Sequence, residues 1–302
     1  MAVDVLGVGC VAVDDLLYVA EYPGPDAKMP IQRTERQCGG LTLTALVAAA
    51  KLGGSCGFAG LLGRDELSCA VLECFRAAGV DVSRAVFCEE AGPFHSMIVV
   101  SEATGSRNIF YRATGAVGAA DSLPEASVIE GCKVLFVDHV GVPGAVRPAR
   151  VARAAGIPVV GDLEDDSHPR FGELLESVNH LVVSLAFALR LTGCAAVEEA
   201  VLALRAGREG VVATCGAEGA WYWSGGKDAV RHQPAFEVAA VDTTGCGDVF
   251  HGAYALGLAR GMEMRERVRF ASAAAALKAT RRGGPGGAPT REELDRFLEG
   301  RR

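Results

Sequence analysis

Short apolar runs alternate with helix-like stretches in the second half of this chain, and this alternation restricts its fold more than any other feature. The runs have the length and residue types of buried strands, and helical spacing of apolar residues follows them. Such an order requires right-handed crossovers between parallel strands. The sequence therefore predicts an α/β fold with a doubly wound, mostly parallel sheet flanked by helices. The predicted strands are 133–138, 157–162, 180–184 and 210–215, followed by an antiparallel pair, 219–223 with 229–232.

The remaining predicted elements include some that do not fit a parallel sheet. The helices are 42–52, 66–78 (ended by Gly79), 145–155, a segment reaching 191, 197–206, 249–259, 264–280 and 291–298, and the other strands are 3–11, 56–62, 94–100 and 108–112. The last two strands alternate like a hairpin. We expect residues 1–302 to form a single α/β domain. A small β-sheet lid, built by about 12–37 and 92–113, should cover the carboxyl ends of its strands.

Composition agrees with this fold and excludes several classes of partner. Half of the residues are hydrophobic and only 6% are aromatic, as in parallel sheets wrapped by helices. The formal net charge is -7 without a long basic run, which argues against nucleic acid or an anionic membrane as partner. No signal peptide is recognisable, and no run reaches the roughly 18 apolar residues of a membrane span. We expect a cytoplasmic protein whose ten cysteines, with no C-x-x-C pair, are free thiols.

Residues 242–253, Asp-Thr-Thr-Gly-Cys-Gly-Asp-Val-Phe-His-Gly-Ala, are the clearest candidate for chemistry. The threonines and glycines lead directly into an apolar helical pattern, so this segment is predicted to be a loop that leads into a helix N-terminus. Backbone N–H groups of a first helical turn lack intrahelical partners and carry the positive end of the helix dipole. Gly245 and Gly247 would let those amides approach an anion closely, which predicts a phosphate-binding loop. The alternative is a plain capping turn, in which Thr243 or Thr244 caps the helix.

Asp248 makes this loop a candidate catalytic site. A carboxylate in that turn lies beside the bound anion, where it can take a proton from a hydroxyl group that attacks the phosphorus. We expect the helix N-terminus to keep this carboxylate ionised, as a base must be, so its pKa need not be raised. The amides of Gly245, Cys246, Gly247 and Asp248 would stabilise charge on the transferring phosphoryl oxygens.

The full twelve-residue string resembles the C-terminal signature of the ribokinase-like (PfkB) carbohydrate kinases. Only Cys246 departs from it, at a place where alanine is common. An early Asp14 and the pair Gly39-Gly40 before a helix resemble the N-terminal signature of the same family. The resemblance covers nearly the whole chain, and the C-terminal half is closest to the sulfofructose-kinase branch. It implies ATP and Mg²⁺ as cofactors, K⁺ as a further cofactor, and a homodimer formed through the lid.

The resemblance also implies roles for single residues. The acceptor sugar would be held by Asp14, Gly39, Gly40 and Thr44. The nucleotide would be bound by Ser184, Thr214, Gly216, Gly219 and Gly284. A potassium ion that shapes the anion loop would be ligated by Asp242 and Thr244.

Several positions depart from the family pattern. Leu41 and Thr44 stand where the family often has asparagines that position the sugar, and of the two only Thr44 can form a side-chain hydrogen bond. Ser184 and Phe187 replace an Asn-x-x-Glu motif that organises Mg²⁺ and phosphate. Val140 stands where the sulfosugar branch has an arginine, so sulfofructose is not the predicted substrate.

Two groups of charged residues stay open to either of two interpretations. The acids at 162 and 164–166 either take over the organisation of the metal or form a hydrated loop. The lid cations either face solvent or meet an acidic group of the substrate, such as a keto-deoxy sugar acid; they are Lys28, Arg33, Arg36, Arg107 and Arg112.

The residues and the resemblance together predict an ATP-dependent kinase that phosphorylates a hydroxyl group, with a primary alcohol of a sugar or sugar derivative favoured. A nucleoside kinase of the same fold is the first alternative, and its lid would need an aromatic slot for the base. A sugar- or nucleotide-binding regulatory protein with weak catalysis is the second. Leu41 and Phe187 favour that second alternative, whereas the intact loop around Asp248 argues against it.

Overall fold

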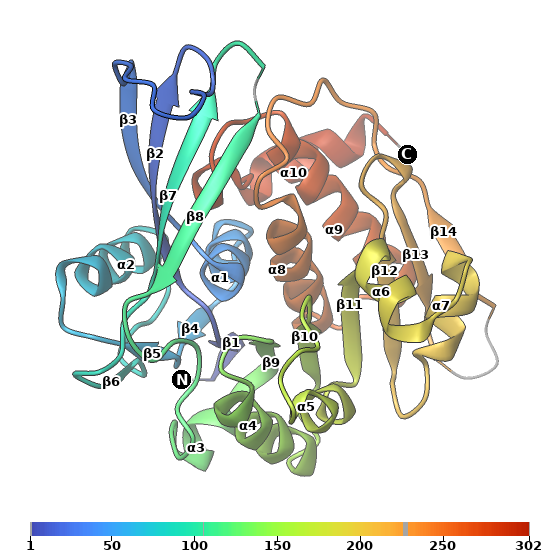
Figure 1. Ribbon diagram of the computed structural model, residues 1–302. Coiled ribbons are helices and arrows are strands. Elements are labelled where there is room, and N and C mark those ends of the chain that lie inside the picture. The colour runs from blue at the N-terminus through green and yellow to red at the C-terminus, as the bar shows by residue number, and fades with distance from the viewer. Residues whose placement is uncertain (1, 105, 226–228, 302) are drawn as a thin grey trace.

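The computed structural model of the protein describes residues 2–104, 106–225 and 229–301, and an eight-stranded sheet forms its centre. Its strands are β1 (Val3–Val8), β4 (Cys56–Phe58), β9 (Cys132–Asp138), β10 (Val159–Asp162), β11 (His180–Ser184), β12 (Gly210–Thr214), β13 (Ala220–Trp223) and β14 (Arg231–Gln233). Their spatial order is β14-β13-β12-β11-β10-β9-β1-β4 (Figure 1). Pairing is parallel from β4 to β12 and antiparallel at β13 and β14. The carboxyl ends of the parallel strands therefore meet at one edge of the sheet.

Helices cover both faces of this sheet, which confirms the predicted doubly wound α/β fold. The core on one face takes in α1 (Leu41–Lys51), α2 (Glu66–Ala77), α8 (Cys246–Ala259), α9 (Met264–Ala279) and α10 (Arg291–Glu299). The core on the other face takes in α3 (Ala126–Ile129), α4 (Val142–Ala154), α5 (Phe171–Ser177), α6 (Leu185–Thr192) and α7 (Val197–Ala203). Successive strand residues alternate between the two cores, so Phe136 belongs to the first core while Leu135 and Val137 belong to the second.

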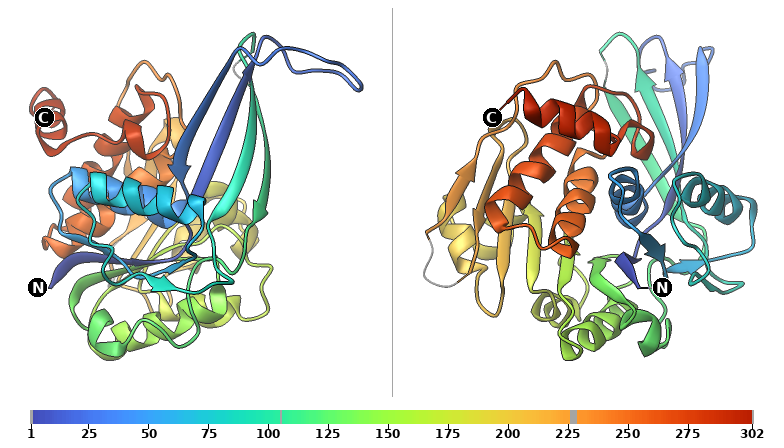
Figure 2. Two further views of the ribbon diagram at one scale, coloured as in Figure 1. Left: turned by 90° about the vertical axis from the view of Figure 1, so that its left-hand side faces the viewer. Right: turned by 180° about the vertical axis from the view of Figure 1, so that it is seen from behind.

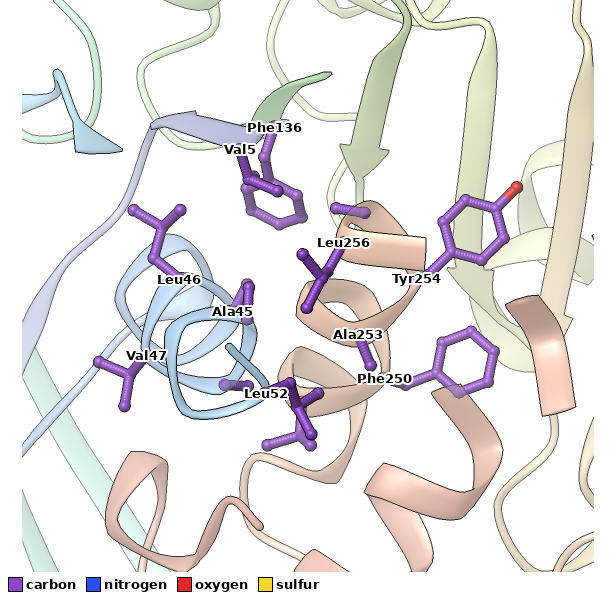
Figure 3. Packing of buried hydrophobic residues seen from close by; sticks show 14 of the residues in the cluster. Val5, Ala45, Leu46, Val47, Leu52, Phe136, Phe250, Ala253, Tyr254 and Leu256 are labelled. Carbon is purple, nitrogen blue, oxygen red and sulfur yellow. The ribbon is translucent and has the colours of Figure 1, made fainter. Parts of the chain in front are cut away.

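The packing of α1 on α8 positions the candidate site. Ala45 of α1 and Ala253 of α8 belong to one buried cluster (Figure 3). Gly252 lets the helices approach, because a Cβ there would overlap the carbonyl oxygen of Ala45. Their first turns also meet, since a Cβ on Gly245 would lie 3.4 Å from Cγ2 of Thr44. Two helix N-termini consequently lie side by side at the carboxyl edge of the large sheet.

A separate four-stranded sheet projects from the body of the molecule (Figures 1 and 2). In spatial order its strands are β3 (Arg33–Gly39), β2 (Ala12–Val19), β7 (Phe94–Ser101) and β8 (Arg107–Ala113). Strand β2 pairs antiparallel with β3 and parallel with β7, and β7 pairs antiparallel with β8, which confirms the predicted hairpin. The strands predicted to lie outside the large sheet thus form this small sheet. Its action as a lid, and the single domain over 1–302, stay predictions.

Some local predictions are wrong. Residues 56–62 form two strands, because the chain turns after Phe58 and β5 (Leu61–Leu62) pairs with β6 (Val86–Phe87). Gly60 is at this turn, where a Cβ would lie 2.6 Å from the Phe58 ring. Helix α8 begins at Cys246, not at residue 249, so Asp248 lies inside its first turn. The elements that no prediction covered are α3, α5, β6 and two 3₁₀ turns, η1 (Gly216–Glu218) and η2 (Pro285–Gly287), and β2 and β3 were predicted only as unspecified parts of the lid.

The prediction of free cysteines is confirmed. All ten cysteines are unpaired. Burial raises the pKa of Cys56 and of Cys132 to about 12, which keeps these thiols protonated and unreactive. Within the described residues, no helix combines the length and the apolar character that crossing a membrane requires.

Candidate active site

Residues 242–248, the anion loop, end at the first turn of α8. Gly245 is the N-cap and has a left-handed φ of 75°, which favours glycine. The amide of Cys246 donates to the carbonyl of Thr243 (3.2 Å), so the amides of Gly247 and Asp248 are the better candidates to meet a ligand. A Cβ on Gly247 would meet no atom within 4 Å, so open space lies directly above this turn. The loop therefore has the shape expected of a phosphate-binding site.

The carboxylate of Asp248 lies among other acids. Burial and the charges of Asp162, Glu164 and Asp138 raise its pKa well above the ordinary value, while His251 acts in the opposite direction. Nothing in the sequence indicates this raised pKa. The physical reason is that these acids belong to strand ends β9 and β10, far from Asp248 in sequence but adjacent to it in the fold.

His251, one turn further along α8, holds the anion loop against the large sheet. Its Nδ1 lies 2.7 Å from the carbonyl oxygen of Gly247, and its Nε2 lies 2.9 Å from that of Val182 on β11. The ring is thus held between a carbonyl oxygen of its own helix and one of the large sheet. The carboxylate of Asp162 lies beside it: this carboxylate is 1% exposed, and its Oδ2 is 3.4 Å from Nδ1. Sequence reasoning missed this pair, since nothing local links residues 162 and 251.

Asp138, at the end of β9, fastens three elements together beneath the site. Its carboxylate is fully buried and accepts hydrogen bonds from the amide of Cys10 (2.6 Å), the hydroxyl of Thr42 (2.7 Å) and the amide of Val140 (2.9 Å). Gly9 makes room for it, because a Cβ there would overlap the carboxylate. The end of β1, the start of α1 and the end of β9 are thereby held in one geometry. The sequence signal that could have found this role is an acid at the end of an apolar strand, next to which the fold places Val8-Gly9-Cys10.

The predicted acceptor residues lie together on the small-sheet side of the anion loop. Asp14 on β2 lies over Gly39, where a Cβ would be 2.7 Å from its Oδ2. Gly40 has a φ of 93° and caps α1 in a place too crowded for a side chain, since a Cβ would lie 2.7 Å from Cα of Val11. Thr44 is buried with its methyl group toward Gly245. Burial raises the pKa of Asp14, and a hydrogen bond with Ser96 opposes this.

A cavity of about 450 Å³ connects the small sheet with the anion loop. Its lining includes Asp14 and Ser96 from the small sheet, Asp242 and Thr244 from the loop, and Arg107 from β8. Arg107 contacts the hydroxyl of Thr244, and its Nη1 lies 3.9 Å from Oδ1 of Asp242. Of the lid cations considered above, Arg107 is the one that lines this cavity. Arg36, by contrast, is already paired with Asp15 and Glu66.

A second cavity, of about 550 Å³, opens on the other side of the anion loop. Three of the five predicted nucleotide-binding residues line it, Thr214, Gly216 and Gly219, together with Cys246 and Gly247. The rest of its lining is largely apolar and includes Phe236, Val238, Phe250, Ala275, Ala276 and Ala279. Such a lining suits the flat, apolar faces of a purine base. Phe236 and the alanines of α9 were missed because they read simply as core residues.

The other two predicted nucleotide-binding residues do not line that cavity. Ser184 caps α6, where its hydroxyl accepts from the amide of Phe187 (3.2 Å), and it pairs in register with Thr214. Gly284 lies on the opposite side of the anion loop, and its amide donates to Oε1 of Gln37 (3.3 Å). Ser184 thus lies beside Thr214 but outside the cavity lining, and Gly284 lies apart from the set; contact of either residue with a nucleotide stays a prediction.

No group of three or more His, Cys, Asp or Glu side chains could hold a metal ion by itself within the described part of the chain. A magnesium ion bound mainly by nucleotide phosphates and water does not need such a cage. The buried carboxylate of Asp162 has no hydrogen-bond partner at either oxygen. That the acids at the end of β10 organise a magnesium ion stays a prediction.

Comparison with known proteins agrees with this geometry. A family model described as pfkB family carbohydrate kinase matches residues 7–291. Ribokinase of Bacillus subtilis (strain 168) is 30% identical over 263 residues, which cover 86% of this chain and 87% of that protein. Ribokinase of Haemophilus influenzae is 28% identical over 304 residues, 97% of each chain. The structure of Arabidopsis thaliana ribokinase complexed with ribose and ATP superposes with a TM-score of 0.88 at 23% identity, over 99% of both chains, and so shares the fold.

Proposed function

The chain belongs to the pfkB family of carbohydrate kinases, and we propose that it transfers the γ-phosphoryl group of ATP to a primary hydroxyl group of a sugar or sugar derivative, with Asp248 as the base. One observation carries this proposal. The anion loop lies between two cavities: Asp242 and Thr244 line the one that contains Asp14, and Cys246 and Gly247 line the one that contains Gly219. An acceptor in the first cavity and a nucleotide in the second would meet at this loop.

The residues of the loop account for the chemical step. Asp248 takes the proton of the acceptor hydroxyl as its oxygen attacks the γ-phosphorus, and the bond from that phosphorus to the β–γ bridging oxygen breaks to release ADP. The amides of residues 245–248, chiefly Gly247 and Asp248, stabilise the charge on the transferring oxygens. The raised pKa of Asp248 makes its carboxylate a stronger base than an ordinary aspartate. Magnesium, when bound near Asp162 and Glu164, would neutralise charge on the nucleotide phosphates.

The raised pKa of Asp248 predicts a pH dependence. A base must be ionised to act, so kcat/KM should fall as the pH drops through the raised pKa, which lies above the ordinary 3.8. We expect an acid limb of slope about one in a plot of log kcat/KM against pH. The residual rate of Asp248→Asn should lack this limb. An unchanged kcat/KM down to pH 3.8, in a protein that circular dichroism shows to be folded, would contradict the assignment.

The acceptor side favours a small polar substrate. Asp14 lines the acceptor cavity and would accept hydrogen bonds from sugar hydroxyls, while Gly39, Gly40 and Thr44, which lie near it but outside that lining, would let the acceptor approach the anion loop. Ribokinase of Arabidopsis thaliana, which shares this fold, is complexed with ribose and ATP. Arg107 would add a positive charge for a substrate that carries an acid group.

A nucleoside acceptor is a second candidate because of one neighbouring feature. A cavity of about 660 Å³ next to the acceptor cavity shares Ser96 and Ile109 with it and contains Phe94 and Tyr111. The ring centroids of Phe94 and Tyr111 are 5.7 Å apart in an edge-to-face arrangement.

A panel of ribose, fructose, sugar acids and nucleosides, assayed for ADP release, separates the two substrate classes. Sugar turnover at least about tenfold above nucleoside turnover in kcat/KM is the expected result.

We propose that the small sheet acts as a lid and joins two chains in a homodimer. The edge strands of this sheet are β3 and β8, and β8 is exposed along its whole length, including Ile109 (51%), Phe110 (56%) and Tyr111 (71%). Apolar side chains and unpaired strand edges of this kind favour pairing with a second copy. Light scattering should give about twice the chain mass of 31.4 kDa at micromolar concentration.

A charged substitution tests where the two chains meet. Phe110→Asp places a charge on the exposed face of β8 and should shift the mass toward that of one chain. Val241→Asp, at another exposed apolar residue (58%), is the matched control and should leave the dimer intact. A 31.4 kDa mass for the unaltered protein would exclude the dimer, and a dimer that both variants retain would place its interface elsewhere.

A further inference from the structure

Lys278 brings an ammonium group to the underside of the anion loop. Its side chain, on α9, is 0% exposed. Nζ donates to the carbonyl oxygens of Asp242 (2.9 Å) and Arg281 (3.1 Å), and it lies 3.9 Å from Oδ2 of Asp242. A buried lysine is rare unless its charge is paired, and here the Asp242 carboxylate supplies the opposite charge. Burial lowers the pKa of Lys278, while Asp242 acts in the opposite direction.

The place occupied by this ammonium is the one in which the sequence predicts potassium. A potassium ion at Asp242 and Thr244 would need oxygen atoms that are free to coordinate it. Both carboxylate oxygens of Asp242 already have donors, since Oδ1 accepts from the amide of Thr244 (2.8 Å) and Oδ2 from the amide of Gly283 (2.9 Å). The carbonyl of Asp242 accepts from Lys278. These residues therefore do not fit a potassium ion alongside the lysine.

The surrounding loop is built around lysine side chains. A Cβ on Gly287 would lie 3.2 Å from Cε of Lys278, so this glycine makes room for the lysine stem. The carbonyl oxygens further along the loop are held by a second lysine: Nζ of Lys51 lies 3.3, 2.9 and 3.2 Å from those of Pro285, Gly286 and Ala288. Four of the eight carbonyl groups of residues 281–288, those of Arg281, Pro285, Gly286 and Ala288, are thus paired with ammonium groups.

We infer that Lys278 is a built-in cation that replaces a monovalent metal ion beneath the anion loop, so that this protein works without potassium. A compact ammonium on a flexible stem provides one positive charge and three donors, which matches two carbonyls and a nearby carboxylate. It links the anion loop, through Asp242, to the loop that follows α9, through Arg281. In the proposed reaction, on which this part of the inference rests, Lys278 is a positioning residue for the loop amides.

The test compares cations in two measurements. Melting curves of the full chain, without sugar or nucleotide, are recorded in potassium chloride and in tetramethylammonium chloride at equal ionic strength. ATP-dependent turnover is measured in the same two salts. We expect the unaltered protein to show the same Tm in both and turnover that differs by less than about twofold. Because the melting curves need no activity, an error in the proposed function leaves this part of the test intact.

Variants of Lys278 supply the contrast. Lys278→Ala removes the ammonium and leaves space, so potassium should raise its Tm and restore part of a turnover that is reduced by at least about tenfold. Lys278→Met removes the charge but fills most of the space and should gain a smaller response to potassium. Lys51→Met removes the other ammonium group that binds carbonyl oxygens of this loop, not the one beside Asp242. This variant should gain no response to potassium. A specific rise in Tm and turnover with potassium in the unaltered protein would overturn the inference, as would a folded Lys278→Ala variant that is indifferent to potassium.

Discussion

We expect the Asp248→Asn variant to have a kcat about 10²- to 10⁴-fold below that of the unaltered protein, with little change in ATP affinity. The substitution keeps the size of the side chain and its place in the first turn of α8, so the backbone amides of residues 247 and 248 should stay available to a phosphate. It removes the group that accepts the proton of the attacking hydroxyl. Steady-state kinetics and calorimetry with ATP measure the two effects separately.

A control shows whether this loss belongs to the site. Asp295→Asn removes an exposed carboxylate of α10, where the side chain pairs with Arg291, and should leave kcat unchanged within about twofold. An Asp248→Asn variant that keeps more than about a tenth of the turnover would show that Asp248 is not the base.

The Asp14→Ala variant should raise the KM for the acceptor by about 10- to 100-fold while ATP affinity stays the same. A hydrogen bond to a charged group contributes about 1.5–3 kcal/mol, which corresponds to that range. Asp14 lines the acceptor cavity and is absent from the lining of the nucleotide cavity, so the loss should be confined to one substrate. Initial rates at varied acceptor concentration and calorimetry with ATP test both halves of the prediction.

Asp15 provides the matched control on the same strand. Its carboxylate pairs with Arg36 (2.7 Å) and His95 (2.7 Å) and is absent from the lining of the acceptor cavity. Asp15→Ala should therefore change the acceptor KM by less than about threefold. Equal losses of acceptor and ATP affinity in Asp14→Ala would place Asp14 outside the acceptor site.

The alternation of strands and helices predicted the large sheet because each of its parallel strands depends on local apolar patterning. The anion loop was equally predictable from the sequence, since Gly245, Gly247 and Asp248 occur within one turn of a predicted helix. The end of the strand after Phe58 could not be predicted in this way, because it depends on the tight contact of Gly60 with an aromatic ring. Local patterning does not report such contacts.

The electrostatics of the site are the part that sequence reasoning could not supply. The pKa of Asp248 depends on Asp162, Glu164 and Asp138, which only the parallel pairing of β9 with β10 brings together. Lys278 lies in an alanine-rich helical segment, where a lysine is ordinarily exposed to solvent. Its hydrogen bond to Asp242, 36 residues earlier in the chain, depends on how α9 packs against α8.

The most direct test of the central claim is the mass of the product formed from a sugar, ATP and magnesium. A kinase should add one phosphoryl group, about 80 Da, to the acceptor and release one ADP for each sugar consumed. The same mixture with Asp248→Asn should yield at least about 100-fold less phosphosugar in the same time. ATP cleaved to ADP and free phosphate with no change in acceptor mass, across sugars, sugar acids and nucleosides, would contradict the account.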